Sequence, residues 1–142
     1  MIFANRVALP EHLARHRLAD LFLDTLPYNA HTTASDALWT GLPLLTCLGE
    51  TFAGRVAASL LHAIGLPELV ASDLDDYEHR AVTLATDRAA LAGLKRKLAD
   101  NRLATALFDS ERFTRSLEAA YQAMLARHAA GLPPDHIIFP EG

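Results

Sequence analysis

Short apolar runs alternate with segments of helical spacing in the first half of the chain. Apolar residues bounded by turn signals predict strands at residues 2–4, 21–23, 43–47 and 69–71. Apolar spacing and the placement of Pro and Gly predict helices at residues 10–19 and 32–40, and a third from Phe52 to Gly65. Strands that alternate with helices are typical of a three-layer parallel sheet with helices on both faces, the doubly wound α/β class.

The second half carries helical patterns only. Three helices are predicted at residues 74–85, 88–103 and 111–130, each after a capping residue, at Asp73, Asp87 and Ser110. The last helix has an apolar stripe that predicts a buried face, formed by Phe113, Leu117, Ala120, Tyr121, Met124 and Leu125. The apolar tail at residues 135–140 is expected to pack back. We therefore expect one domain over residues 1–142, with an α/β part at 1–72 and a helical part with a tail at 73–142.

The polar loop after the second predicted strand is the candidate for ligand chemistry. In an open α/β sheet such a loop lies at the carboxyl end of a strand, and the free N–H groups of the next helix favour an anion. His31 adds an imidazole there, and Thr32 and Thr33 add hydroxyls. Asp36 can share a helix face with the threonines, and because a carboxylate repels phosphate it would face a neutral ribose diol. The loop therefore predicts a nucleotide site.

An ordinary helix start explains the same residues. Thr32 or Thr33 could serve only as an N-cap, Asp36 could complement the helix dipole, and His31 could be a surface loop residue. The residues alone leave both interpretations open.

Composition narrows the class of protein. The chain has 142 residues, of which 51% are hydrophobic and 21% charged, as in ordinary globular domains. A net charge of -4 gives no electrostatic case for nucleic acid. The single cysteine, Cys47, lies in an apolar run and is expected to be a buried structural thiol. No apolar run is long enough to span a bilayer and the start lacks a signal-peptide pattern, so we expect a cytoplasmic protein without membrane partners.

Several enzyme classes lack their motifs. The glycine fingerprint of dinucleotide folds is absent, which argues against hydride transfer. Gly49 and Gly54 have the spacing of a P-loop, but Arg55 and Val56 stand where an NTPase needs Lys and Ser or Thr. No histidine or cysteine pair has the spacing of a zinc site, so no metal is expected.

Two charged residues near this glycine pair are further candidates. Glu50 and Arg55 could line a ligand cleft beside His31. A surface salt bridge or a helix cap explains them equally well.

Several separate motifs, in order, are similar to one known family. They are Leu23-Asp24-Thr25, residues 29–33, Asp36, Leu38-Trp39, Gly41, residues 49–51, residues 55–59 and Pro134-Asp135-His136. From residue 2 to residue 140 the chain resembles the C-terminal catalytic lobe of the O-linked N-acetylglucosamine transferases, including bacterial homologues with tetratricopeptide repeats. Related protein O-fucosyltransferases share this architecture.

The resemblance implies a GT-B glycosyltransferase with two Rossmann-like lobes, in which N-acetylglucosamine moves from UDP-GlcNAc to Ser or Thr hydroxyls of proteins without a cofactor or metal. It assigns diphosphate binding to His31, Thr32 and Thr33, ribose binding to Asp36, and a place near uracil to His12 and Arg15. Two positions depart from the family pattern. Leu9 stands where a lysine is common beside the uracil, and Ala34 stands where a glycine is common.

The family's catalytic lysine and N-terminal lobe lie upstream of the matched segment, so no catalytic residue is identifiable in this chain. We therefore expect the isolated chain to bind UDP weakly and to transfer nothing. The expected partners are a UDP-sugar, a protein acceptor, and the N-terminal lobe and repeat domain of a parent chain. The sequence leaves three further functions open: a non-catalytic interaction domain with a degenerate nucleotide site, an O-fucosyltransferase lobe that uses GDP-fucose, and a stand-alone phosphate-binding protein.

Overall fold

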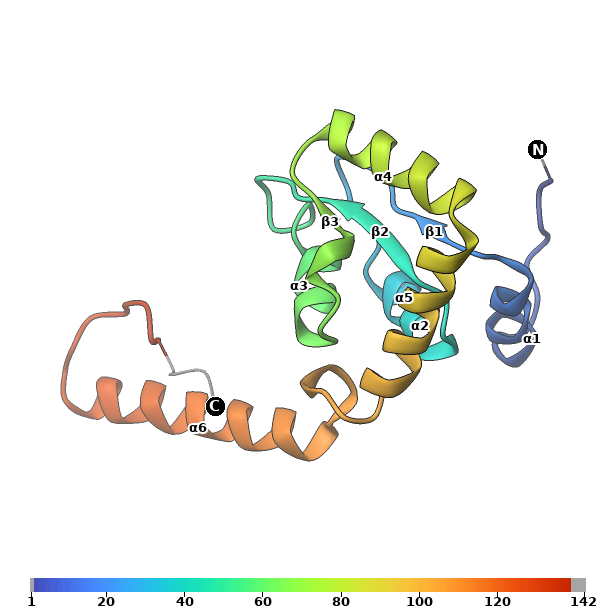
Figure 1. Cartoon of the computed structure of the whole chain (residues 1–142). Helices are drawn as coiled ribbons and strands as arrows, with labels where there is room; N and C mark the ends of the chain where they lie inside the picture. Colours follow the sequence, from blue (N-terminus) through green and yellow to red (C-terminus); the bar gives the residue numbers. More distant parts are fainter. Residues whose placement is uncertain (1, 139–142) are drawn as a thin grey trace. The chain divides into compact units, whose positions relative to one another are not determined.

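The structure, a computed structural model, describes residues 2–138 (Figure 1). The strands are β1 (Phe22–Leu23), β2 (Leu44–Cys47) and β3 (Val70–Ala71). The α-helices are α1 (Leu9–Arg15), α2 (Thr32–Thr40), α3 (Val56–Ala63), α4 (Leu74–Thr86), α5 (Arg88–Asn101) and α6 (Ser110–Ala129). Short 3₁₀ helices are η1 (His16–Leu18), η2 (Pro67–Leu69) and η3 (Ala106–Phe108). The chain divides into two compact units, one that ends at Leu107 and one that begins at Phe108.

The first unit is built on a parallel sheet with the strand order β1-β2-β3. Phe22 lies opposite Leu44, and Thr46 lies opposite Val70. The strands lie side by side in the same order as in the chain. Because crossovers between parallel strands are right-handed, the two connecting helices, α2 and α3, lie on the same face of the sheet. Helix α4 contacts β2 and β3 from the other face (Figure 1). The α/β class predicted from the alternating pattern is therefore confirmed.

The core of this unit surrounds β2, whose four residues are all buried. A strand covered on both faces appears in the sequence as a nearly continuous apolar run, and in β2 only Thr46 interrupts the apolar residues. Helix α2 contributes Leu38 and helix α3 contributes Leu61, both fully buried. Burying a leucine side chain stabilises a fold by about 1.5–3 kcal/mol, so these contacts fix both helices on the sheet.

Helix boundaries follow the predicted signals closely. Helix α2 spans the predicted residues, and Gly41 ends it with φ 87°, a left-handed conformation that favours glycine. Asp73 and Asp87 cap α4 and α5 as predicted, each through its carboxylate. The cap of α6 is Asp109 instead of the predicted Ser110, because the Asp109 carboxylate accepts from the Arg112 N–H at 2.8 Å.

Three predictions near the sheet are wrong. Residues 2–4 form no strand, because no strand of the described residues pairs with them. Ile2 and Phe3 are 97% and 86% exposed. The first helix becomes 3₁₀ after Arg15 and leaves Leu18 exposed. The third helix begins at Val56, not at Phe52, because the preceding residues form a closed glycine loop.

In the second unit, the predicted burial of the α6 stripe is wrong. Phe113 and Leu125 are 66% and 67% exposed, because no other helix of this unit is present within the described residues to cover them. The tail returns to α6 through polar contacts, since the Arg127 Nε–H donates to the Pro133 carbonyl at 2.6 Å and the Arg127 guanidinium pairs with Asp135 at 3.2 Å. Its described apolar residues are not buried, and Ile138 is 90% exposed. Residues 139 and 140 of that tail lie outside the described part. Within residues 2–138, no helix has the length and apolar character needed to cross a membrane.

Candidate functional site

Asp24, the residue directly after β1, organises the carboxyl edge of the sheet. Its side chain is buried, with 6% exposed. Oδ1 accepts from the Thr25 N–H at 2.8 Å and from the Ala30 N–H at 2.7 Å, and Oδ2 accepts from the Thr46 hydroxyl at 2.7 Å. A buried carboxylate needs such donors, because an unpaired charge is very costly away from water. These bonds fold the loop after β1 over the ends of β1 and β2.

Asn29 joins this loop to the loop after β2. It is 1% exposed, and its backbone N–H donates to the Ala53 carbonyl at 3.1 Å. Its side-chain Nδ2 donates to the Thr25 carbonyl at 3.1 Å. Its Oδ1 is buried and has no hydrogen-bond partner within residues 2–138. Asp24, Asn29 and Thr46 are the buried polar residues of the described chain, and all three lie at this edge.

The glycine pair of the β2–α3 loop has a packing role. The Gly49 N–H donates to the Gly54 carbonyl at 2.7 Å and closes the loop. A Cβ on Gly49 would lie 3.0 Å from the Gly54 Cα, closer than most such contacts, so the backbone at Gly54 would have to move slightly to accept a side chain there. The P-loop-like spacing is therefore explained by the close approach of two backbones.

Helix α2 begins at this edge without a capping side chain. His31 occupies the N-cap position and makes no side-chain cap, and the first intrahelical bond runs from the Ser35 N–H to the His31 carbonyl at 3.0 Å. Thr32 and Thr33 are exposed in the first turn. The interpretation of either threonine as the N-cap is therefore wrong. Asp36 lies beyond the first turn, which holds no acidic residue, so it does not serve as a dipole partner there.

The His31 imidazole lies among aromatic rings. It stacks on Tyr28, with 5.0 Å between ring centroids and 17° between planes, and meets Phe52 edge to face at 6.3 Å. Its Nε2 is buried and has no hydrogen-bond partner among the described residues. The rings hold the imidazole at the start of α2, where amide N–H groups give the helix end a partial positive charge.

Helix α1 packs against α2 and brings the other predicted residues close. The His12 and His16 rings meet edge to face with 4.9 Å between centroids, and His16 Nδ1 lies 3.2 Å from the Thr40 hydroxyl on α2. The Arg15 guanidinium donates to the Asn5 carbonyl at 3.0 Å. Burial, then the neighbouring His12, lowers the pKa of His16, and the Asp36 carboxylate opposes this shift. His12 and Asp36 therefore both influence His16, a residue that was assigned no binding role from the sequence.

Glu50 and Arg55 both lie on the β2–α3 loop with exposed side chains. Glu50 lines a cavity of about 340 Å³ together with Pro27, Cys47 and other residues of this edge. Arg55 holds the N-cap position of α3 but makes no side-chain cap. Neither residue forms an ion pair within the described chain, so both predicted roles as a salt bridge or a cap lack support.

Two further groups at this edge were missed by sequence reasoning about ligands. The Tyr77 hydroxyl of α4 donates to the Asp24 carbonyl at 2.8 Å, and burial, then the Asp24 charge, raises the pKa of Tyr77. Cys47 is buried as predicted, and burial raises the pKa of its thiol. Both groups therefore stay protonated at neutral pH. In the sequence, only the position of Asp24 directly after an apolar strand indicated that polar groups gather at this edge.

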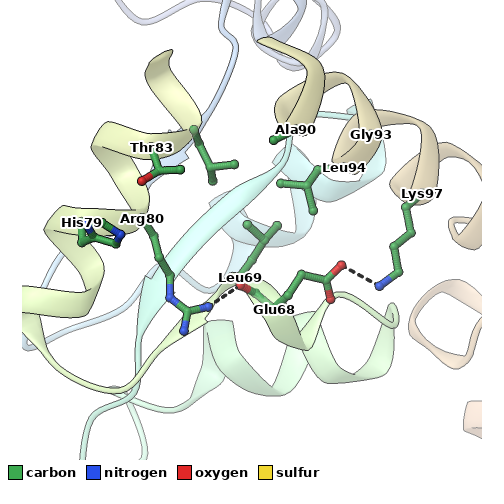
Figure 2. A pocket seen from close by; sticks show the side chains of 10 residues that line it. Glu68, Leu69, His79, Arg80, Thr83, Ala90, Gly93, Leu94 and Lys97 are labelled. Atoms are coloured by element: carbon green, nitrogen blue, oxygen red, sulfur yellow. Dashed lines mark hydrogen bonds and ion pairs between the residues drawn. The ribbon is translucent and has the colours of Figure 1, made fainter. Parts of the chain in front are cut away.

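A separate hollow of about 510 Å³ lies between α4 and α5 (Figure 2). Leu69 and Leu94 line it. Its charged groups already have partners: Lys97 pairs with Glu68 at 2.6 Å, and Arg80 pairs with Asp76 at 2.7 Å and donates to the Glu68 backbone carbonyl at 2.6 Å. None of the residues predicted to bind a ligand reaches this hollow.

Comparison with known proteins gives consistent results. The family model "Glycosyl transferase family 41" matches residues 1–117. The chain is 42% identical to a UDP-N-acetylglucosamine--peptide N-acetylglucosaminyltransferase of Caenorhabditis elegans over 96% of its length, and 40% identical over the same share to the probable enzyme SEC of Arabidopsis thaliana. It spans 12% and 14% of these two relatives. A mutant O-GlcNAc transferase of Thermobaculum terrenum superposes with a TM-score of 0.79 at 38% identity, covering 83% of this chain and 23% of that one.

Proposed function

The chain belongs to glycosyl transferase family 41, and from this premise we propose that it forms the nucleotide-sugar-binding part of a protein glycosyltransferase. In this proposal N-acetylglucosamine moves from UDP-GlcNAc to Ser or Thr hydroxyls of protein acceptors. One observation carries the proposal: the uncapped first turn of α2 at the carboxyl edge of the sheet, beside the buried and unpartnered Nε2 of His31. Ligands of open α/β sheets bind at such an edge.

The diphosphate is assigned to the start of α2. There, amide N–H groups, the hydroxyls of Thr32 and Thr33 and the His31 imidazole supply donors toward an anion. During transfer the acceptor oxygen forms a bond to the anomeric carbon and loses its proton to a base outside this chain. The bond between the anomeric carbon and the diphosphate oxygen breaks, so negative charge grows on the leaving UDP. Fixed donors that face this charge lower the barrier, because they need no reorganisation during the reaction. No metal or cofactor is part of this assignment.

The nucleoside is assigned to the side of α2 that faces α1. Asp36 accepts from the ribose diol, and His12 and Arg15 lie near the base. Support comes from the packing of α1 on α2 and from the electrostatic link between Asp36 and His16, the residue directly after α1. Leu9, at the start of α1, supplies no charge to the base, so base recognition falls to the remaining residues of this helix.

We further propose that this chain alone binds UDP but transfers no sugar. The chain spans about an eighth of its curated relatives, and none of its residues is assigned to attack or proton transfer. The partners of the proposed activity are the acceptor protein and the N-terminal lobe and repeat domain of the family.

Calorimetric titration with UDP tests the proposal. We expect His31→Ala to weaken binding by about 10-fold or more, as for a hydrogen bond to a charged group, and Asp36→Ala to weaken it similarly. His62→Ala and Asp100→Ala change exposed residues of the same types and should leave the affinity unchanged. No binding of UDP at millimolar concentration would favour the interaction domain with a degenerate site.

Two ligand comparisons test whether the site prefers a different nucleotide or a simple anion. Tighter binding of GDP than of UDP would favour an O-fucosyltransferase lobe. Tighter binding of free phosphate than of UDP would favour a phosphate-binding protein of another kind. Robust transfer of GlcNAc to a peptide by the chain alone would overturn the expected inactivity.

A further inference from the structure

His16 links the two helices that flank the proposed nucleoside site. It begins η1, directly after α1, and its Nδ1 lies 3.2 Å from the Thr40 hydroxyl at the end of α2. On its other side, the His16 ring contacts the ring of His12 edge to face. His16 therefore contacts one residue on each helix, and it is assigned neither to the diphosphate nor to the nucleoside.

The hydrogen bonds of Thr40 favour a proton on Nδ1 of His16. The Thr40 hydroxyl has a single proton, and the Asp36 and Ala37 carbonyls both lie 2.9 Å from its oxygen. A hydroxyl that donates to these helix carbonyls has only lone pairs left for a third neighbour. The contact to His16 is then a bond in which Nδ1–H donates to Thr40, so the neutral ring is the Nδ1–H tautomer.

We propose that His16 is a positioning residue of the nucleotide site: its neutral imidazole holds α1, and with it the His12 ring, against the helix that carries Asp36. This inference rests on the proposed function, since it treats His12 and Asp36 as nucleoside contacts. His16 itself touches no ligand in this arrangement.

The charges around His16 make the arrangement sensitive to pH. His12 and Arg15 face it from α1, and Asp36 faces it from α2. Arg17 and Arg102 line a hollow beside Thr40. A proton on Nε2 gives His16 a positive charge that these cations repel and that attracts the Asp36 carboxylate away from a ribose. Burial and the His12 charge lower the pKa of His16, so the ring is neutral at pH 7 and becomes charged only in acid.

Two substitutions distinguish the hydrogen bond between His16 and Thr40 from the positive charge of protonated His16. His16→Asn keeps an N–H donor near the Nδ1 position but cannot take up a proton, whereas His16→Ala removes the donor. At pH 8 we expect His16→Asn to bind UDP-GlcNAc like the wild type, and His16→Ala to bind about 5-fold more weakly, as for the loss of one net hydrogen bond. Between pH 8 and pH 5.5 the wild type should lose more affinity than His16→Asn. The control His62→Asn, exposed on α3, should follow the wild-type curve.

UDP-GlcNAc is the probe because its diphosphate is a diester without a proton that titrates in this range. The proposal is overturned if His16→Asn keeps the full pH dependence, or if His16→Ala binds as tightly as the wild type. ¹⁵N NMR of the imidazole gives a test without ligand: an Nε2–H tautomer for neutral His16 also contradicts it. Absence of wild-type binding overturns the proposed function as well, whereas binding that depends on His31 but not on His16 overturns this inference alone.

Discussion

The buried hydrogen bond between Thr46 and Asp24 is predicted to be a main support of the sheet edge. The Thr46 hydroxyl lies 2.7 Å from Asp24 Oδ2, and both residues are buried. Thr46→Val keeps the volume of the side chain and removes the donor, which leaves one oxygen of a buried carboxylate without its partner. A hydrogen bond to a charged group contributes about 1.5–3 kcal/mol, so we expect Thr46→Val to lower the free energy of unfolding by about 2 kcal/mol.

Urea unfolding followed by tryptophan fluorescence measures this loss. Trp39 is the single tryptophan and lies on α2, so its signal reports the first unit. With a urea dependence of about 1–3 kcal/mol per molar, a loss of about 2 kcal/mol moves the midpoint by about 1 M. Thr46→Ser keeps the hydroxyl and loses one methyl group, which costs about 0.8 kcal/mol before any cavity effect. Thr86→Val, at an exposed position on α4, should change the stability by less than about 0.5 kcal/mol.

The comparison between the two Thr46 variants decides the result. The hydrogen-bond account requires Thr46→Val to lower the free energy of unfolding more than Thr46→Ser does, because only valine leaves Asp24 Oδ2 without its donor. A midpoint for Thr46→Val within experimental error of the wild type, or a larger loss for Thr46→Ser, would show that packing dominates at this position. The UDP affinity of folded Thr46→Val should stay within about twofold, because the Asp24 bonds to Thr25 and Ala30 remain.

Two further changes test other parts of the structure. Gly93→Ala on α5 should raise the free energy of unfolding by up to about 1 kcal/mol, since a Cβ there meets nothing closer than the Arg96 guanidinium at 4.0 Å; a decrease in urea midpoint would contradict this. His31→Asp should be about 1 kcal/mol more stable than His31→Ala because it adds an N-cap to α2, yet it should bind UDP even more weakly. Retention of wild-type UDP affinity by His31→Asp, measured by calorimetry, would refute the placement of the diphosphate.

The sheet and its helices were predictable because their signals are local. Gly41 ends α2 where the pattern placed the end, and the aspartates that cap α4 and α5 precede clear helical spacing. Such signals depend on the geometry of one turn, so they work without knowledge of tertiary contacts. The position of the candidate loop at the carboxyl edge follows from the same alternation.

Predictions that required a distant partner failed. Ile2 and Phe3 were predicted to lie in a strand, and Phe113 was predicted to lie on a buried helix face, but all three are exposed. Apolar spacing indicates that a surface can be covered, and it does not identify the element that covers it. Asp24 shows the converse case. Its buried role depends on Thr46, 22 positions later, and no local pattern joins the two residues.

Side-chain capping differs among the helices that begin at the carboxyl edge of the sheet. Helix α4, which follows β3 at this edge, begins at an aspartate that accepts a backbone N–H, as do α5 and α6, whereas α2 and α3 begin without a side-chain cap. An aspartate cap typically contributes about 1 kcal/mol, so its omission at α2 has a cost in stability. A carboxylate at that position would occupy the amide N–H groups and repel a diphosphate. The uncapped start of α2 is therefore consistent with a helix end kept open for an anionic ligand, while Asp24 stabilises the same edge from within the protein interior.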